Sequence, residues 1–522
     1  MQLSASGHVV SGTGPRQYAT GRRNLSTATT VIGLAAFAAV LHLFIPFNHD
    51  LAFFIEGAGR LLDGGRLGTE VMDINPPHVW WISLVPVWLA REIGIRSDTA
   101  ATIFTAVMAA TSLLACDRLI QVCSPVGQNH RALLAVAAIV LLFVPGYDFG
   151  QREHWALILT LPYVIARSRC ISGATLSRTA GVIIGIAAGL GFFMNPHLLL
   201  VPATLEVWLL ARTRRPFVWI SAETVSMTVA GLAYLGLVII YVPSYLEIEV
   251  PNALLGYWAF RGMPLGVVQA ALVVLTPPAV LAIVGYRTRC KGEKLPALAE
   301  FFAVAGAAYF VAALVQMTPW SYHFLPGVAL FYFSAAVLLL TGTPRAGMNS
   351  IRFGALMILT AISLLPSAAK AVQHFEGGGT TARVNQLAAV FRAHPGPTGI
   401  VSGFITSPRD VYPALVASRM KWALPVCCEY LIAAAVRADE APAGKRAAIR
   451  AAGLEQARIA VAATRAKQPG VIVVDIGEDK LGFNGRPFSY VNWLKANTTF
   501  ASVLAHYREI DPIGRFRLFV KK

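Results

Sequence analysis

The sequence predicts a polytopic α-helical membrane protein with a soluble α/β domain at its C-terminal end. The first observation is the composition: 56% of the 522 residues are hydrophobic, the mean hydropathy is +0.58, and 14% are charged. Soluble domains average roughly 25% charged residues. The second is a series of apolar runs, of spanning or near-spanning length, between residues 25 and 369. The third is a change of composition after about residue 370.

The N-terminal 24 residues are polar and contain three arginines. The apolar run that follows, 25–47, is longer than the roughly 7–15 residues of a signal-peptide core, and no small-residue cleavage site follows it. We therefore expect residues 1–24 to form a cytoplasmic tail and 25–47 to be an uncleaved first span. The formal charge of +17 does not indicate nucleic-acid binding, because the basic residues lie in short clusters between apolar runs, as membrane topology requires.

Eleven apolar runs are predicted to cross the membrane within a domain of residues 25–369: 25–47, 99–118, 131–146, 154–167, 179–194, 196–211, 218–242, 264–286, 297–317, 322–341 and 351–369. The positive-inside rule places the basic loops in the cytoplasm only if the tryptophan-rich segment 77–89 does not cross. This segment is therefore expected to lie in the membrane interface, within an external first loop over 48–98. The C-terminus is then external.

A short amphipathic helix is predicted within this first loop, in the stretch NHDLAFFIEGAGRLLDGG (48–65). Apolar residues recur there at helical spacing, Glu56 falls on the polar face, and Asp50 stands in the first turn. Because Asp is a preferred N-cap residue, Asp50 could be either a capping residue or a functional carboxylate.

Residues 370–522 are predicted to form the external α/β domain. Its periodicity indicates two buried strands, TGIVSGF (398–404) and VIVVDIG (471–477), and two amphipathic helices, LEQARIAVAATRAKQ (454–468) and FASVLAHYREI (500–510). GRFRLFVKK (514–522) could be a terminal edge strand, and GEDKLGFNG (477–485) has too many turn residues for a strand.

Polar side chains gather in four outward-facing segments. These are the start of the first loop, YDFGQREH (147–154), NPHLLLVP (195–202) and TPWSYHFLP (318–326). Asp50 and Glu153 could supply carboxylates from two loops on one face, as general acid–base chemistry requires. Positive or hydrogen-bonding groups for an anionic leaving group such as phosphate could come from Arg152, His154, His197 and His323.

Several of these residues also suit different roles. Two carboxylates with a histidine could hold a divalent cation such as Mg²⁺ or Mn²⁺, with Asp50 and Glu153 as ligands. Glu153 also suits the positive end of a helix dipole, with Arg152 as its surface partner. Asn195-Pro196 is a common helix start.

The order of these segments resembles the GT-C glycosyltransferases, which include protein O-mannosyltransferase-like and lipid A aminoarabinose transferase-like bacterial enzymes. The residues that carry the resemblance are Asp50, the A..LL.GG pattern over 58–65 and NPP at 75–77, followed by an acid in the second outer loop. The resemblance implies a bacterial inner-membrane enzyme. It would move a sugar from a polyprenyl-phosphate donor to a glycan, lipid or protein acceptor on the periplasmic side.

By position, Asp50 matches the first-loop aspartate that serves as catalytic base or as acceptor-orienting group in this family. Glu153 matches the acid of the second loop, a role for which Asp148 competes. A single displacement with Asp50 as base would invert the anomeric carbon. Further candidate contacts to the acceptor or between loops are Glu56, Asn75, Asp148 and Tyr322.

Two other classes of protein remain alternatives. A transporter is expected to carry ionisable residues deep in its spans or inverted repeats, whereas Glu206 and Glu223 lie near cytoplasmic ends of spans. A polymer ligase that uses a lipid-linked glycan is expected to have a large late outer loop with a catalytic arginine or histidine. The loop over 243–263 is modest in length, and Arg261 is its candidate for a phosphate-binding residue.

Overall fold

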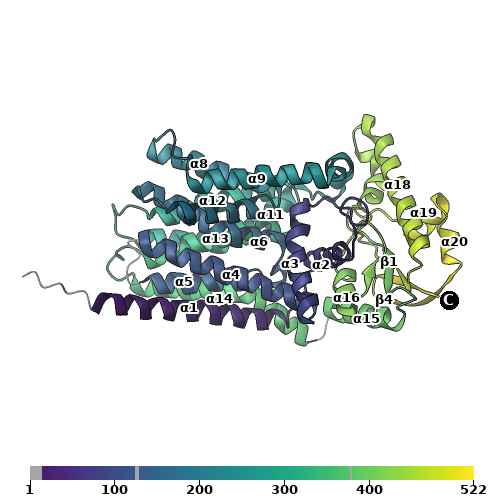
Figure 1. Ribbon diagram of the computed structural model, residues 1–522, viewed down its shortest axis with the longest axis horizontal. Helices are drawn as coiled ribbons and strands as arrows, with labels where there is room; N and C mark the ends of the chain where they lie inside the picture. Colours follow the sequence, from purple (N-terminus) through teal and green to yellow (C-terminus); the bar gives the residue numbers. More distant parts are fainter. Residues whose placement is uncertain (1–14, 124–128, 377–378) are drawn as a thin grey trace, which may run out of the picture.

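A computed structural model describes residues 15–123, 129–376 and 379–522. Figure 1 shows long helices that run side by side, with a C-terminal α/β domain at one end of this bundle. The bundle contains α1 (Pro15–His42), α4 (Ser97–Cys123), α5 (His130–Phe143), α6 (Arg152–Arg169), α7 (Arg178–Phe192), α8 (Leu200–Thr213), α9 (Ala222–Tyr241), α11 (Pro264–Arg287), α12 (Ala297–Val315), α13 (Ser321–Leu340) and α14 (Asn349–Phe375). Each of these helices overlaps one of the eleven predicted apolar runs.

Within the described ranges, six helices are long and apolar enough to cross a membrane: α4, α9, α11, α12, α13 and α14. Shorter apolar helical segments occur in α1, α5 and α7. A membrane protein is therefore confirmed, while the count of eleven spans stays a prediction. Helix α1 begins at Pro15, inside the predicted tail, and α14 continues to Phe375, past the predicted boundary at residue 369.

Helix α13 lies at the centre of the bundle and α9 at its periphery. In their most apolar windows, 89% of α13 is buried against 17% of α9. Helix α9 packs on α7 through small residues: a Cβ added at Gly185 would lie 2.2 Å from the Glu223 carbonyl oxygen. Small residues that let helix backbones approach are typical of packing between membrane helices.

Two helices of the first loop, α2 (His49–Leu62) and α3 (Pro77–Ile93), lie between the bundle and the C-terminal domain. Figure 1 shows α3 running across the direction of the bundle helices, which is the orientation expected of an interfacial helix. The two pack closely because Gly57 leaves room for Trp80, whose ring would lie 2.3 Å from a Cβ at that position. The 245–260 loop forms the short elements η5 (Tyr245–Glu249), α10 (Val250–Gly256) and η6 (Tyr257–Phe260).

The C-terminal domain is built on a five-stranded sheet in the order β2-β1-β3-β5-β4. The strands are β1 (Ile400–Phe404), β2 (Lys421–Trp422), β3 (Val471–Asp475), β4 (Tyr507–Ile513) and β5 (Phe516–Lys521). Strand β1 pairs in parallel with β2 and β3, and β5 pairs antiparallel with β3 and β4. Strands β1 and β3 occur at the two predicted buried strands, and β5 occurs within the predicted terminal strand.

Helices cover both faces of this sheet. Figure 1 shows α18 to α20 on one side and α15 and α16 on the other. The helices of this domain are α15 (Gly379–Ala393), α16 (Val411–Ser418), α17 (Tyr430–Val436), α18 (Ala443–Lys467), α19 (Tyr490–Asn497) and α20 (Phe500–Leu504). The Ser402 hydroxyl of β1 lies 2.7 Å from the Thr464 hydroxyl of α18, which joins the two layers.

Two predictions for this domain are wrong. FASVLAHYREI is not one helix, because α20 ends at Leu504 and the chain continues as β4 from Tyr507. The last strand, β5, is not an edge strand, because it lies between β3 and β4. In both cases the antiparallel pairing of β4 with β5 decides the outcome, and that pairing is a tertiary feature that local periodicity does not report.

Candidate functional site

A cavity of about 850 Å³ lies where the end of the bundle meets the C-terminal domain. Its walls come from the first loop, from the second outer loop, from the turn at 195–197, from 245–260 and from 316–322. The C-terminal domain completes it with residues of 406–409, 426–430, 479–481 and Arg515. The polar first-loop and second-loop residues in the lining are His49, Asp50, Asp73, Asn75, Tyr147, Asp148, Gln151 and Arg152.

Asp50 lines this cavity and is not the cap of its helix. The N-cap of α2 is Asn48, whose Oδ1 accepts hydrogen bonds from the backbone N–H groups of Asp50 (2.9 Å) and Leu51 (3.1 Å). The Asp50 side chain is 21% exposed. Since Asn48 performs the capping, the Asp50 carboxylate is available for another role.

Two neighbours orient the Asp50 carboxylate. Gln151 donates a hydrogen bond from Nε2 to Asp50 Oδ2, at 3.1 Å. The Nε2 atom of His49 lies 3.5 Å from Asp50 Oδ1. The Gln151 side chain also caps α6, because its Oε1 accepts the Glu153 N–H at 3.0 Å. Sequence reasoning missed Gln151, because glutamine is not among the residues that usually mark a helix start.

The second outer loop packs closely on α2. Gly150 has a φ of +80°, and a Cβ there would lie 2.8 Å from Leu51 Cδ2. Asn48 donates a hydrogen bond to Asp148 Oδ1 at 3.1 Å. Burial, together with the negative charges of Asp50 and Glu153, raises the pKa of Asp148 to about 7. A buried carboxyl between two acids holds its proton more tightly than one in water.

Arg152 lines the cavity with its charge already balanced. Its Nη2 lies 2.6 Å from Glu153 Oε1, and its Nη1 donates to the side-chain oxygen of Asn75. Asn75 in turn donates to Asp73 Oδ2 at 2.6 Å. The guanidinium is therefore held in one position by two loops, while part of it faces the cavity.

Glu153 and His323 lie behind Arg152. Neither belongs to the cavity lining, and both are buried. His323 Nε2 lies 3.7 Å from Glu153 Oε1, and its Nδ1 lies 2.7 Å from the Thr318 hydroxyl. The structure thus places these two predicted site residues in a supporting layer.

The other predicted site residues divide between the cavity and the rest of the molecule. Asp50, Asn75, Asp148, Arg152, His197 and Tyr322 line the cavity together. His154 is buried beside it, where its Nδ1 accepts the Gly150 N–H at 3.0 Å and its Nε2 lies 2.9 Å from the Leu141 carbonyl oxygen. Arg261 is exposed outside the lining, and Glu56 is buried against the C-terminal domain.

One oxygen of each predicted metal ligand is in contact with a nitrogen atom, while Glu153 Oε2 has no hydrogen-bond partner among the described residues. The Arg152 guanidinium takes Glu153 Oε1, and the Gln151 amide N–H points at Asp50 Oδ2. No group of three or more His, Cys, Asp or Glu side chains that could hold a metal occurs in the part of the chain described. A divalent cation held by Asp50 and Glu153 stays a prediction.

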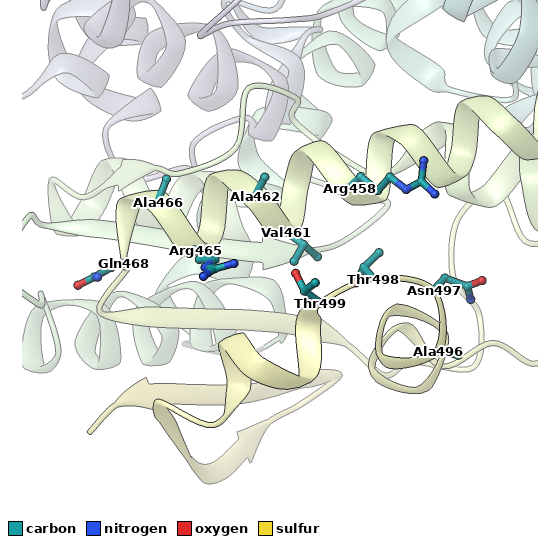
Figure 2. Close-up of a pocket in the computed structure, with 10 residues that line it drawn as sticks. All are labelled: Arg458, Val461, Ala462, Arg465, Ala466, Gln468, Ala496, Asn497, Thr498 and Thr499. Atoms are coloured by element: carbon teal, nitrogen blue, oxygen red, sulfur yellow. The ribbon is translucent and has the colours of Figure 1, made fainter.

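Figure 2 shows a second hollow, of about 780 Å³, on the C-terminal domain. It lies between α18 and the turn that joins α19 to α20. Arg458 and Arg465 border it, but none of the ten residues that line it is an acid or a histidine. It therefore offers no general base, and the cavity at Asp50 is the candidate active site.

Comparisons with known proteins identify the fold. The chain is similar to ArnT from Cupriavidus metallidurans, solved bound to undecaprenyl phosphate, with 13% identity, a TM-score of 0.60, and coverage of 94% of this chain and 97% of that one. It also matches the arabinofuranosyltransferase AftD from Mycobacteria, with 13% identity, a TM-score of 0.43, and coverage of 94% of this chain and 40% of AftD.

A third match is the Archaeoglobus fulgidus oligosaccharyltransferase in complex with Zn and sulfate, with 12% identity, a TM-score of 0.42, and coverage of 94% and 73%. No protein-family model and no curated protein matches the sequence. Both of these TM-scores are below 0.5, so the comparison of folds rests on ArnT. The chain therefore shares the fold of ArnT over nearly its whole length, in agreement with the resemblance seen in the sequence.

Proposed function

We propose that this protein is a membrane glycosyltransferase that moves a sugar from a polyprenyl-phosphate carrier to an acceptor hydroxyl. The observation that carries the proposal is the Asp50 carboxylate, which Asn48 relieves of capping and which faces a cavity at the end of the bundle. The fold shared with ArnT, a protein solved bound to undecaprenyl phosphate, supports a lipid-phosphate donor.

The proposed orientation follows the positive-inside rule. The N-terminus would be cytoplasmic, and the cavity and the C-terminal domain would be periplasmic, on a bacterial inner membrane. A cavity of about 850 Å³ is within the roughly 300–1,000 Å³ range of small-molecule sites. It suits a sugar phosphate with part of an acceptor, while the polyprenyl chain stays in the bilayer.

The proposed reaction is a single displacement. The acceptor oxygen forms a bond to the anomeric carbon as the bond from that carbon to the phosphate oxygen breaks. The acceptor proton passes to Asp50, and the phosphate leaves with the bonding electron pair. Gln151 donates a hydrogen bond to Asp50 Oδ2, whereas Oδ1 has only the more distant contact with His49 Nε2 at 3.5 Å, so the Oδ1 atom is the proposed proton acceptor. One displacement inverts the configuration of the anomeric carbon.

Arg152 is the proposed cation for the leaving phosphate. Glu153 and Asn75 fix its guanidinium before the substrate binds, and a preorganised donor loses little free energy on reorientation. In this proposal Glu153 and His323 are positioning residues for Arg152. His197 is a further hydrogen-bonding group in the same cavity.

The test uses the purified protein in nanodiscs with a panel of radiolabelled polyprenyl-phosphate sugars and envelope lipids, glycans and peptides as acceptors. Release of polyprenyl phosphate and sugar transfer are measured for the wild type, Asp50→Asn and Asp63→Asn. Asp63 is the matched control, since it ends the same helix and pairs with Arg91 and Lys421 outside the cavity. We expect turnover of one donor, lost in Asp50→Asn and kept in Asp63→Asn.

Other outcomes point elsewhere. Equal transfer rates for the wild type and Asp50→Asn would contradict the role of Asp50 as a base. The proposed class of enzyme would still stand. Retention of configuration in the product would contradict the single displacement. If none of the donors binds saturably, the ligase and transporter alternatives are favoured.

A further inference from the structure

The C-terminal domain meets the cavity with the carboxyl ends of its parallel strands. The residues that follow β1 (406–409), β2 (426–428) and β3 (479 and 481) all line it. Strand β1 lies between β2 and β3, both parallel to it, so the strand order reverses beside β1. In open α/β sheets, ligands bind outside the carboxyl ends of the strands at such a reversal.

The cavity lining contains three arginines, of which two are already paired. Arg515 lies 2.9 Å from Asp475 and 3.0 Å from Asp479. Arg152 lies 2.6 Å from Glu153. Arg409 has no acidic partner within ion-pair distance in any of the three described stretches of the chain. Its neighbour Asp410 pairs instead with Arg383, at 3.0 Å.

Arg409 belongs to a loop that is anchored on both sides. Thr406 before it is 1% exposed, and Asp410 after it is 3% exposed. The Arg409 side chain itself is exposed to the cavity. An arginine on an open surface is solvated and needs no partner. Arg409 instead lies in a cavity, on a loop whose flanking residues Thr406 and Asp410 are buried.

The positive charge of Arg409 also influences Tyr147, which lines the same cavity as Asp50. Burial raises the pKa of the Tyr147 phenol, and the positive charge of Arg409 opposes that rise. The Tyr147 hydroxyl lies 2.9 Å from His49 Nδ1, and His49 directly precedes Asp50. The two domains therefore present an unpaired cation and an available carboxylate to the same space.

We propose that Arg409 binds an anionic group of a substrate, a phosphate or a carboxylate, so that the C-terminal domain takes part in substrate recognition. This inference rests on the proposed function. The guanidinium fork matches both anions in geometry and charge. The anion could be the phosphate of the lipid donor or an acidic group of the acceptor, and two separate measurements distinguish these sources.

The test compares the wild type, Arg409→Gln, Arg409→Lys and Arg458→Gln in nanodiscs. Arg458 is the matched control, since it is an exposed arginine of the same domain that borders the hollow in Figure 2. Two quantities are measured: the Kd for a polyprenyl phosphate, and the KM values for the donor and acceptor that the wild type uses. Melting temperatures verify that each variant is folded.

If the anion is the donor phosphate, Arg409→Gln should raise the Kd for polyprenyl phosphate by about 10- to 100-fold, as expected for the loss of a hydrogen bond to a charged group. If the anion belongs to the acceptor, that Kd should stay constant and the KM for the acceptor should rise by the same factor. In either case Arg409→Lys should recover part of the loss, because it keeps the charge.

One contrary result is that the wild type turns over a donor while Arg409→Gln and Arg458→Gln have equal Kd and KM values. That result would overturn the role of Arg409 and leave the proposed function standing. A wild type that binds no polyprenyl phosphate and turns over no donor would overturn the proposed function, and the role of Arg409 with it.

Discussion

Helix α2 carries two carboxylates in very different surroundings. Asp50, in the first turn, is 21% exposed and receives one hydrogen bond from another side chain, that of Gln151. Glu56, near the middle, is 4% exposed; its Oε1 accepts the Trp422 N–H at 2.8 Å, and its Oε2 lies 3.2 Å from Arg60 Nε. The comparison indicates that Glu56 holds the two domains together, while Asp50 keeps one oxygen without a hydrogen bond from any other described side chain, as its proposed role requires.

The surroundings of Glu56 attach the first loop to the C-terminal domain. Arg60 Nη1 donates to the carbonyl oxygens of Glu70 and Leu424, both at 2.8 Å. Met72 donates its N–H to the Pro425 carbonyl oxygen, also at 2.8 Å. This contact fixes the distance across the cavity, and so it determines where Arg409 stands relative to Asp50.

The largest expected effect is on the rate of Asp50→Asn. Loss of a general base should lower kcat by about 10²–10⁴-fold, while the Kd for polyprenyl phosphate and the melting temperature stay near wild-type values. Steady-state transfer, lipid binding and thermal unfolding measure the three. If Asp50→Asn lowers the melting temperature as much as a core substitution does, Asp50 stabilises the fold as Glu56 does.

The second effect is on stability. Glu56→Ala should cost about 3–5 kcal/mol, because it leaves the buried Arg60 guanidinium without its carboxylate. Thermal unfolding and protease sensitivity of the C-terminal domain measure the loss. The double variant Glu56→Met with Arg60→Met should recover much of it, and an unchanged melting temperature in Glu56→Ala would remove the contrast between the two acids.

A smaller effect is expected at Gln151. Gln151→Ser can still cap α6 but cannot reach Asp50, so kcat should fall about tenfold, as for the loss of one hydrogen bond to a charged group, with little change in melting temperature. Gln151→Leu should lose the cap as well and add a stability cost of about 1 kcal/mol. Equal kcat in Gln151→Ser and the wild type would show that Asp50 needs no orienting donor.

The last effect concerns pH. Burial raises the pKa of Asp148 to about 7, well above the ordinary aspartate value. The folded state then binds more protons than the unfolded state between about pH 4 and 7, so this group's stabilisation is present at low pH and is lost as pH rises through 7. Asp148→Asn should flatten the fall of the melting temperature over that range; an identical slope in wild type and variant would contradict it.

Local periodicity determined a large part of this protein. Each apolar run predicted from hydropathy overlaps a helix, and strands β1 and β3 occur where β-branched residues cluster. The amphipathic pattern placed Asp50 in the first turn of α2. These features depend on residues a few positions apart, and such residues share one face of one element.

The tertiary structure alone decided which polar groups meet. Glu56 appeared as a polar-face residue, yet its partner Trp422 lies 366 positions further along the chain. Glu153 and Arg152 are adjacent in sequence, but only the packed loops place Arg152 at the cavity and Glu153 behind it. The sequence did not identify Arg409 as a candidate site residue, because only the fold shows that this cation is unpaired among the described residues and lines a cavity shared by the two domains. Partner choice depends on contacts between distant elements, which no local pattern records.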